Sequence, residues 1–287
     1  ARGRVLMGRY EIKEKIGSGG MGAVYRAYDN SRKEEIAIKV LLPSLLDNEQ
    51  AKERFLSEAR ISSNLSHPNI VNVFDVQKDE ELYFITMELL EGKTLRMDME
   101  QRKLLRSGYN YKEAKEIAKA LCIALQYAHE QTVHRDIKPE NIWIGEDGSI
   151  KLMDFGIARA MKSSQLTMTG MSMGTLYYMA PEQCKSSGSV DHRADQYSLG
   201  VTIYEMLAGE VPTGRAKPLH KECKGVPRKF SLAVEKALEG KPEKRHRNIK
   251  EFSHELQKKE GMLKKAFAAM LLMVYLTALF HYYPIYA

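Results

Sequence analysis

The chain has 287 residues, of which 44% are hydrophobic and 28% charged, and its formal net charge is +7. This composition is that of a globular protein with enough apolar residues for a core, and it excludes the disordered and low-complexity classes. Much of the positive excess lies between residues 241 and 265, without aromatic residues interleaved in a pattern suited to base stacking, so we discount nucleic acid as a partner.

The first part of the chain has the pattern of a small β-rich lobe with one helix. Apolar and β-branched runs predict strands at residues 10–16, 23–28, 36–41, 71–75 and 82–87. Over residues 49–65 the apolar positions change to helical spacing, and His67-Pro68 closes this predicted helix.

From about residue 92 onward the chain is mainly helical. One amphipathic helix is predicted over residues 114–128, and the apolar stretch 197–208 is typical of a helix buried inside a lobe. Two short strands, 142–144 and 150–153, are predicted between them. The long segment 155–195 has no clear periodicity, which favours a functional loop. Residues 209–218 also have the pattern of a loop.

The last residues, 266–287, form a separate apolar stretch. A helix of about 20 apolar residues spans a bilayer, and Lys264 and Lys265 before the stretch match the basic flank of a cytoplasmic side. The sequence therefore predicts a transmembrane helix with the preceding domain in the cytoplasm. The alternative is a buried core helix or a cap at the end of the domain, with the protein in the cytoplasm. Three cysteines without CxxC spacing indicate a reducing compartment.

A glycine cluster, G-x-G-x-x-G-x-V, occupies residues 17–24. A dinucleotide-binding turn shows the same spacing, but that turn leads from a strand into a helix. Here the glycines lie between two predicted strands, and a lysine follows in the next strand. This context favours a hairpin folded over phosphate groups, which glycine lets the backbone approach closely.

The lysine is Lys39, two residues after Ala37, so both side chains project from one face of the strand. A small side chain beside a lysine leaves room for a flat ring, with the ammonium reaching toward phosphates. Nineteen residues later, Glu58 interrupts the apolar stripe of the predicted helix. Because an unpaired buried charge is costly, we expect Glu58 to pair with Lys39.

The strongest signal is HRDIKPEN at residues 134–141, followed by DFG at 154–156. Asp154 and Asn141 supply the hard oxygen ligands that Mg²⁺ prefers. Asp136 is then available to accept the proton of an incoming hydroxyl, and Lys138 to stabilise the charge that develops on a transferred group. The pattern indicates phosphoryl transfer.

With these motifs the chain resembles the protein kinase family from about residue 10 to 257, and most of all the bacterial eukaryotic-like (Hanks-type) Ser/Thr kinases. The resemblance implies an α+β, bilobal fold. It assigns residues 1–89 to a β-rich N-lobe and 90–257 to a helical C-lobe. The hydropathy and charge of the remaining residues assign 258–265 to a basic juxtamembrane segment and 266–287 to the predicted transmembrane helix. The resemblance also implies ATP and Mg²⁺ as cofactors, and proteins with Ser or Thr acceptors as substrates.

The resemblance further implies a nucleotide site in the cleft between the lobes. Its expected members are Gly17, Gly19, Gly22, Val24, Ala37, Lys39, Met87, Glu88, Leu90 and Trp143. Of these, Trp143 departs from the family, which usually has an aliphatic floor beneath the adenine.

Thr167 and Thr169 lie where related bacterial kinases autophosphorylate, and a homodimer in which one copy acts on another is a candidate partner for that reaction. A basic residue must meet each added phosphate, and Arg135 has the planar fork suited to it. The alternative is that these threonines are ordinary loop residues. The resemblance makes residues 134–141 the catalytic loop and implies structural roles for four more residues. Thr175 is expected near this loop, Glu182 is expected to pair with Arg245, and Asp195 is expected to anchor the loop.

Two other classes of protein compete with an active protein kinase. A pseudokinase scaffold usually lacks the equivalents of Lys39, Asp136 or Asp154, and all three are present here. A small-molecule kinase of related fold generally lacks the peptide-binding segment from Gly174-Thr175 to the APE motif at residues 180–182, which this chain retains. Both observations favour the protein kinase.

Overall fold

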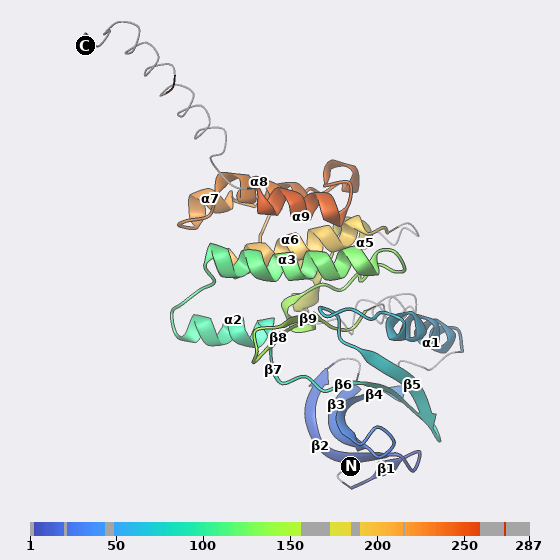
Figure 1. The fold of residues 1–287 in the computed structure, drawn as a ribbon. Helices are drawn as coiled ribbons and strands as arrows, with labels where there is room; N and C mark the ends of the chain where they lie inside the picture. Colours follow the sequence, from blue (N-terminus) through green and yellow to red (C-terminus); the bar gives the residue numbers. More distant parts are fainter. Residues whose placement is uncertain are drawn as a thin grey trace, which may run out of the picture.

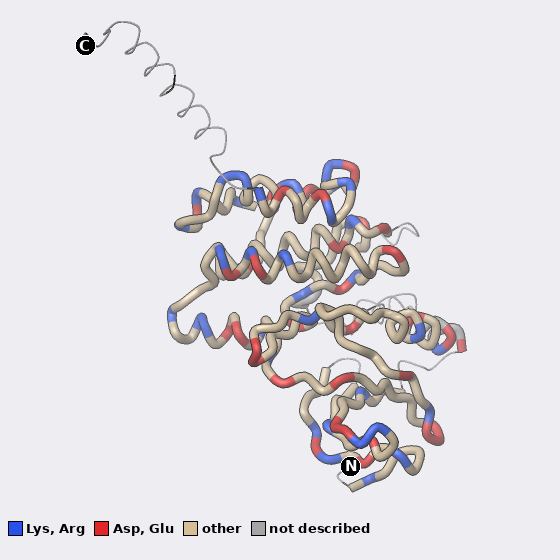
Figure 2. Tube along the Cα trace, in the orientation of Figure 1, with Lys and Arg blue, Asp and Glu red and all other residues tan. Residues whose placement is uncertain are grey.

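The computed structural model describes residues 3–19, 22–43, 49–155, 173–184, 190–214, 216–258 and 273. Figure 1 shows two lobes: strands β1 to β6 lie together near the N-terminus, and most of the helices form a larger second body. Basic and acidic residues are interspersed along the described chain in both lobes (Figure 2). The architecture is the bilobal α+β arrangement expected from the sequence.

The small lobe contains an antiparallel sheet in the order β1-β2-β3-β4-β6-β5. Its strands are β1 (Val5–Leu6), β2 (Tyr10–Gly19), β3 (Gly22–Asp29), β4 (Glu34–Leu41), β5 (Val73–Asp79) and β6 (Leu82–Glu88). Ile36 and Ile38 of β4 have no exposed surface and pack with Phe84 of β6. The alternation of β4 thus directs one set of side chains into the core of the lobe.

Helix α1 (Glu49–Ser63) belongs to the small lobe and packs on its sheet. Phe55 and Ala59 of the helix are buried together with Leu41 and Ile85 of the strands. The helix ends at Ser63, two residues before the predicted boundary. The apolar stripe seen in the sequence is therefore the face that holds α1 to the sheet.

The large lobe is mainly helical. Its helices are α2 (Leu95–Leu104), α3 (Tyr111–Ala128), α5 (Pro181–Cys184), α6 (Arg193–Ala208), α7 (Leu219–Glu222), α8 (Arg228–Ala237) and α9 (Ile249–Gln257), with 3₁₀ turns η2 (Pro139–Asn141), η3 (Met173–Tyr178) and η4 (Pro242–Lys244). A small antiparallel sheet joins β7 (Gly92–Thr94), β8 (Ile142–Gly145) and β9 (Ile150–Leu152).

Helix α6 is buried on nearly every face, as its apolar sequence predicts. Leu199, Val201 and Ile203 have no exposed surface, although these positions point in different directions around the helix. The helix ends at Ala208 and is capped by Gly209, whose φ of 78° suits glycine. The described residues between 209 and 218 carry no helix, in agreement with the predicted loop.

Backbone hydrogen bonds join the two lobes at the chain that follows α1 in the sequence. The backbone N–H of Val71 donates to Leu152 of β9 at 3.0 Å, and the N–H of Leu152 donates to Asn69 at 2.9 Å. The chain that follows α1 is thus held next to the strand that leads to Asp154.

Within the described ranges, no helix combines the length and the apolar character needed to cross a membrane. The predicted transmembrane segment 266–287 lies, except for residue 273, outside the described residues, as do Lys264, Lys265, Thr167 and Thr169.

Candidate active site

The glycine-rich hairpin connects β2 to β3, where Gly17 pairs with Val24 and Gly19 with Gly22. Gly22 has a φ of 143°, and a Cβ at this position would lie 1.9 Å from the carbonyl oxygen of Val40. Glycine is therefore required for β3 to approach β4 this closely. Strand β3 of the hairpin pairs directly with β4, the strand that carries Lys39.

The residues expected to contact a base lie on neighbouring strands. Ala37 on β4 pairs with Met87 on β6; Ala37 is buried and Met87 half-buried. Glu88 is the last residue of β6, and its carboxylate accepts hydrogen bonds from Lys151 of β9 at 2.7 and 3.0 Å. Leu90, half-buried, follows in the segment that connects the lobes. The Glu88–Lys151 pair therefore links the two lobes beside this segment.

Trp143 lies on β8 and is half-buried. Its indole N–H donates to the carbonyl oxygen of Glu91 at 3.2 Å, and the Glu91 carboxylate accepts from Arg26 of β3 at 2.6 Å. A Cβ at Gly92 would lie 3.0 Å from the indole nitrogen. The tryptophan is thus held against the connecting segment, whereas its contact with a nucleotide stays a prediction.

Lys39 and Asp154 form a partly buried ion pair between the lobes. The Lys39 ammonium donates to both carboxylate oxygens of Asp154 at 2.8 Å. Burial alone would raise the pKa of the Asp154 carboxyl, but the charge and hydrogen bonds of Lys39 hold that pKa below its usual value. Asp154 therefore stays ionised at neutral pH. Glu58 is buried on α1 with 6% of its surface exposed, and its pairing with Lys39 stays a prediction.

The catalytic loop brings Asp136, Lys138 and Asn141 together. The Lys138 ammonium lies 2.9 Å from Oδ2 of Asp136. The side-chain amide of Asn141 donates to the same oxygen at 2.9 Å and to the Asp136 carbonyl oxygen at 2.8 Å. These bonds use the amide nitrogen of Asn141, so its amide oxygen is the atom suited to a hard cation.

Asp195 holds this loop from the buried helix α6. Its carboxylate accepts hydrogen bonds from the backbone N–H of His134 at 2.9 Å and of Arg135 at 2.7 Å, and lies 2.9 Å from Nε2 of His129. Burial would raise the pKa of Asp195, but the hydrogen bonds with His129 and with the backbone N–H of Arg135 lower it. Arg135 has a φ of 66°, a strained conformation that these bonds help to maintain.

His134 connects the loop to the segment that carries Asp154. Its Nδ1 accepts from the N–H of Asp136 at 3.2 Å, so Nε2 carries the proton and donates to Met153 at 2.8 Å. The His134 ring also packs edge-on against Phe155, with 4.5 Å between ring centroids.

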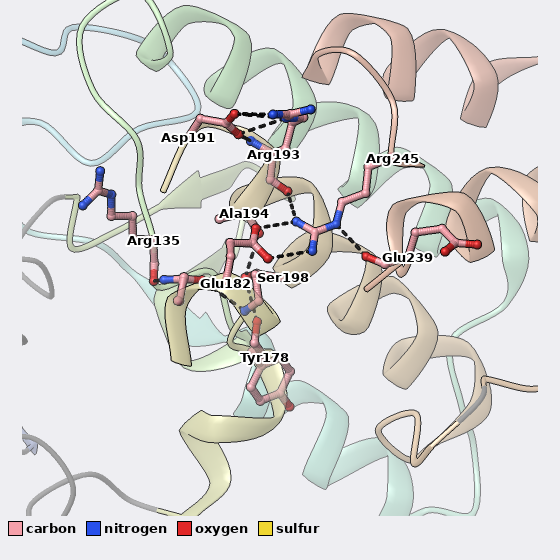
Figure 3. A network of polar contacts seen from close by, with 11 residues as sticks. Arg135, Tyr178, Glu182, Asp191, Arg193, Ala194, Ser198, Glu239 and Arg245 are labelled. Carbon is pink, nitrogen blue, oxygen red and sulfur yellow. Dashed lines mark hydrogen bonds and ion pairs between the residues drawn. The ribbon is translucent and has the colours of Figure 1, made fainter. Parts of the chain in front are cut away.

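Glu182 and Arg245 form the pair that the resemblance implies (Figure 3). Two nitrogens of the guanidinium donate to the two carboxylate oxygens at 2.6 and 2.8 Å. Arg245 also donates to the carbonyl oxygens of Glu239 at 2.8 Å and Arg193 at 2.9 Å. The ion pair therefore fixes α5, which carries Glu182, to the loop between η4 and α9, which carries Arg245. The backbone of Thr175 lies in η3, but its side chain is outside the described part of the chain.

Comparison with known proteins agrees with this geometry. The family model for the protein kinase domain matches residues 10–271. The chain belongs to the protein kinase family. It is 37% identical over 271 residues to a probable serine/threonine-protein kinase of Clostridium perfringens, covering 89% of this chain and 39% of the relative. It is 40% identical over 211 residues to the serine/threonine-protein kinase PrkC of Bacillus subtilis, covering 73% of this chain and 32% of PrkC.

Solved structures agree. The crystal structure of the Mycobacterium tuberculosis PknI kinase domain superposes with a TM-score of 0.74 at 28% identity, covering 89% of this chain and 98% of that one. The chain thus carries a Ser/Thr protein kinase domain, which is a phosphotransferase. It spans about a third to two fifths of the length of the curated relatives it matches.

The kinase also contains a charged network that sequence reasoning missed. Arg96 of α2 donates to Glu140 of the catalytic loop and to Glu205 of α6, each at 2.8 Å. The Tyr178 hydroxyl contacts both Arg96 and Glu205. The sequence offers one signal for the network, a glutamate within the buried helix α6, but its partner is more than a hundred residues away.

The residues of the kinase site fit a magnesium–nucleotide complex. Asp154 is ionised, Asn141 offers an amide oxygen, and Lys39 supplies a positive charge beside them, which is the chemistry that phosphate oxygens and a hard cation require. When bound, magnesium-ATP would supply the phosphoryl group to be transferred.

Proposed function

We propose that this protein phosphorylates Ser and Thr hydroxyls of other proteins, using ATP and Mg²⁺, and that it activates itself by autophosphorylation. The observation that carries the proposal is the arrangement of Lys138 and Asn141, each within hydrogen-bonding distance of the Asp136 carboxylate, on a loop anchored by Asp195.

In this mechanism the carboxylate of Asp136 accepts the proton of the acceptor hydroxyl and orients its oxygen. Lys138, 2.9 Å away, stabilises negative charge that develops in the transition state. Lys39 orients Asp154 through two hydrogen bonds, so that a carboxylate and the Asn141 amide oxygen are in place to hold magnesium. A scaffold without catalysis has no need of this constellation.

Thr167 and Thr169 are the proposed autophosphorylation sites, with one copy of the chain acting on another in a homodimer. Support comes from Arg135, whose guanidinium donates to the carbonyl oxygen of Val190 at 3.0 Å, in the stretch between the APE motif at residues 180–182 and α6. A phosphate brings about −1.5 to −2 charge, which a guanidinium binds with two hydrogen bonds.

The experiment is incubation of the purified chain with ATP and Mg²⁺, followed by intact mass measurement and phosphosite mapping. We expect phosphate on Thr167 or Thr169, and turnover of a generic protein substrate. Asp136→Asn is the matched control, because it keeps the shape of the side chain and removes the base. Nucleotide binding without phosphate transfer to the chain or the substrate would favour the scaffold.

We also propose that the kinase acts at the cytoplasmic face of a membrane. The support is the uncharged run from 266 to 280, preceded by Lys264 and Lys265. Fractionation of cells that express the chain with and without residues 266–287 tests this proposal. Recovery of both forms in the soluble fraction would refute it.

A further inference from the structure

Helix α1 contacts the Asp154–Phe155 turn through one serine. The hydroxyl of Ser62 lies 2.8 Å from the carbonyl oxygen of Phe155 and 3.1 Å from that of Glu58, one turn earlier in the helix. Ser62 and Phe155 are both buried, with 5% and 3% of their surfaces exposed. Ser62 therefore joins the small lobe to the large lobe at a point that water does not reach.

A hydroxyl has a single proton, and both of its neighbours are acceptors. Serine inside a helix commonly bonds to the carbonyl four residues earlier. The bond to Phe155 is the shorter of the two, close to the preferred O–H···O distance. The hydroxyl of Ser62 is thus available to hold a residue of the other lobe.

Packing at this point is incomplete. A small cavity lies between α1, the strands and the turn. It is lined mainly by apolar side chains: Ala59, Val73, Ile85, Met87 and Phe155, with Ser62 and Asp154 at its edge. The hydrogen bond from Ser62 is the polar contact between α1 and the Phe155 backbone beside this space.

The carbonyl that Ser62 holds directly follows Asp154. Asp154 has a φ of 59°, uncommon for a residue other than glycine, so its orientation depends on the contacts around it. On one side Lys39 binds the carboxylate. On the other, the Phe155 ring packs on His134 of the catalytic loop.

We propose that Ser62 is a positioning residue for magnesium binding: its hydroxyl holds the Phe155 carbonyl and thereby keeps Asp154 oriented as a metal ligand. This inference rests on the proposed function, because it takes Asp154 as the ligand. It makes the position of α1 and the metal affinity of the kinase depend on each other.

The test compares Ser62→Thr with Ser62→Val. The two side chains have nearly the same shape and differ by a hydroxyl against a methyl, and the cavity offers room for the added group. Ser63→Ala is the control, since Ser63 is half-buried and its hydroxyl donates within the helix to the carbonyl oxygen of Arg60, away from Phe155. Ser62→Ala is the second variant, in case valine prevents folding, and circular dichroism verifies that each variant is folded.

The readout is the fluorescence of Trp143, the single tryptophan of the chain, during titration with ADP in the presence and absence of Mg²⁺. We expect Ser62→Thr and Ser63→Ala to match the unmodified chain. We expect Ser62→Val and Ser62→Ala to weaken magnesium-dependent ADP binding by about three- to tenfold, the effect of one buried hydrogen bond, with metal-free binding unchanged.

Equal behaviour of the threonine and valine variants would overturn the inference, as would an equal loss of metal-free and magnesium-dependent binding. An unmodified chain whose ADP binding does not respond to Mg²⁺ would also overturn it. Failure of the proposed function is a distinct result: the unmodified chain would bind magnesium-ADP yet transfer no phosphate.

Discussion

Replacing Arg245 with methionine removes a guanidinium whose side chain has no exposed surface. The change leaves the carboxylate of Glu182, which is only 15% exposed, without the two hydrogen bonds at 2.6 and 2.8 Å. It also deprives the carbonyl oxygens of Glu239 and Arg193 of their donor. Removing one partner of a buried ion pair costs about 3–5 kcal/mol because the other charge stays buried. We therefore expect the free energy of unfolding to fall by about 4 kcal/mol.

Thermal unfolding followed by circular dichroism measures this effect. Each kcal/mol shifts the melting temperature of a domain of this size by roughly 2–4 °C, so Arg245→Met should lower it by roughly 8–16 °C. Arg247→Met is the matched control, because Arg247 is 90% exposed and its pair with Glu251 is a surface pair worth about 1 kcal/mol or less. Adding Glu182→Gln should recover part of the loss, since no buried negative charge then stays unpaired.

The reasoning is refuted if Arg245→Met melts within about 3 °C of Arg247→Met, within the shift that one kcal/mol produces. That result would mean that the carboxylate of Glu182 reaches water or another cation without cost. The structural role of the pair would then be smaller than its geometry indicates.

Three further predictions follow from single contacts. Gly22→Ala should lower the melting temperature and weaken nucleotide binding several-fold, since its Cβ would meet Val40 at 1.9 Å, whereas Gly19→Ala, whose Cβ would meet no atom within 4 Å, should leave the melting temperature unchanged. Burial would raise the pKa of Glu251, but hydrogen bonds from basic neighbours outweigh it and lower the pKa to about 2. The ionised Glu251 should therefore make the unmodified chain more stable than Glu251→Gln. This difference in the free energy of unfolding, measured by urea unfolding, should have its maximum at pH 7 and disappear as the pH falls from 4.5 through 2. Arg96→Met should cost about 2–4 kcal/mol in the same assay, and a cost below 1 kcal/mol would contradict its role in the network.

The chemical core of the site was predictable from sequence because it is local. Asp136, Lys138 and Asn141 lie within six residues, so a loop of almost any shape keeps them near one another. The alternation of β4 placed Ala37 and Lys39 on one face, and the helical stripe marked α1. These are short-range properties of the backbone, and they do not depend on how the lobes pack.

Contacts between distant segments were harder to predict. The structure shows Lys39 bound to Asp154, 115 residues away, a contact that the sequence did not indicate, and the pairing of Lys39 with Glu58 stays a prediction. Ser62 looked like an ordinary polar residue near a helix end, and nothing in its neighbours indicated Phe155 as a partner. A pairing of this kind depends on the orientation of two lobes, which periodicity does not encode.

The sequence alone determined the class of chemistry and the order of the elements, since both follow from residue types at fixed short spacing. The tertiary structure decided most of the pairings between charges: Arg96 with Glu140 and Glu205, and Glu88 with Lys151. The physical reason is that a buried charge requires a partner within about 4 Å. Many carboxylates in the chain are chemically equivalent candidates, and only the packing of helices and strands brings one of them to that distance.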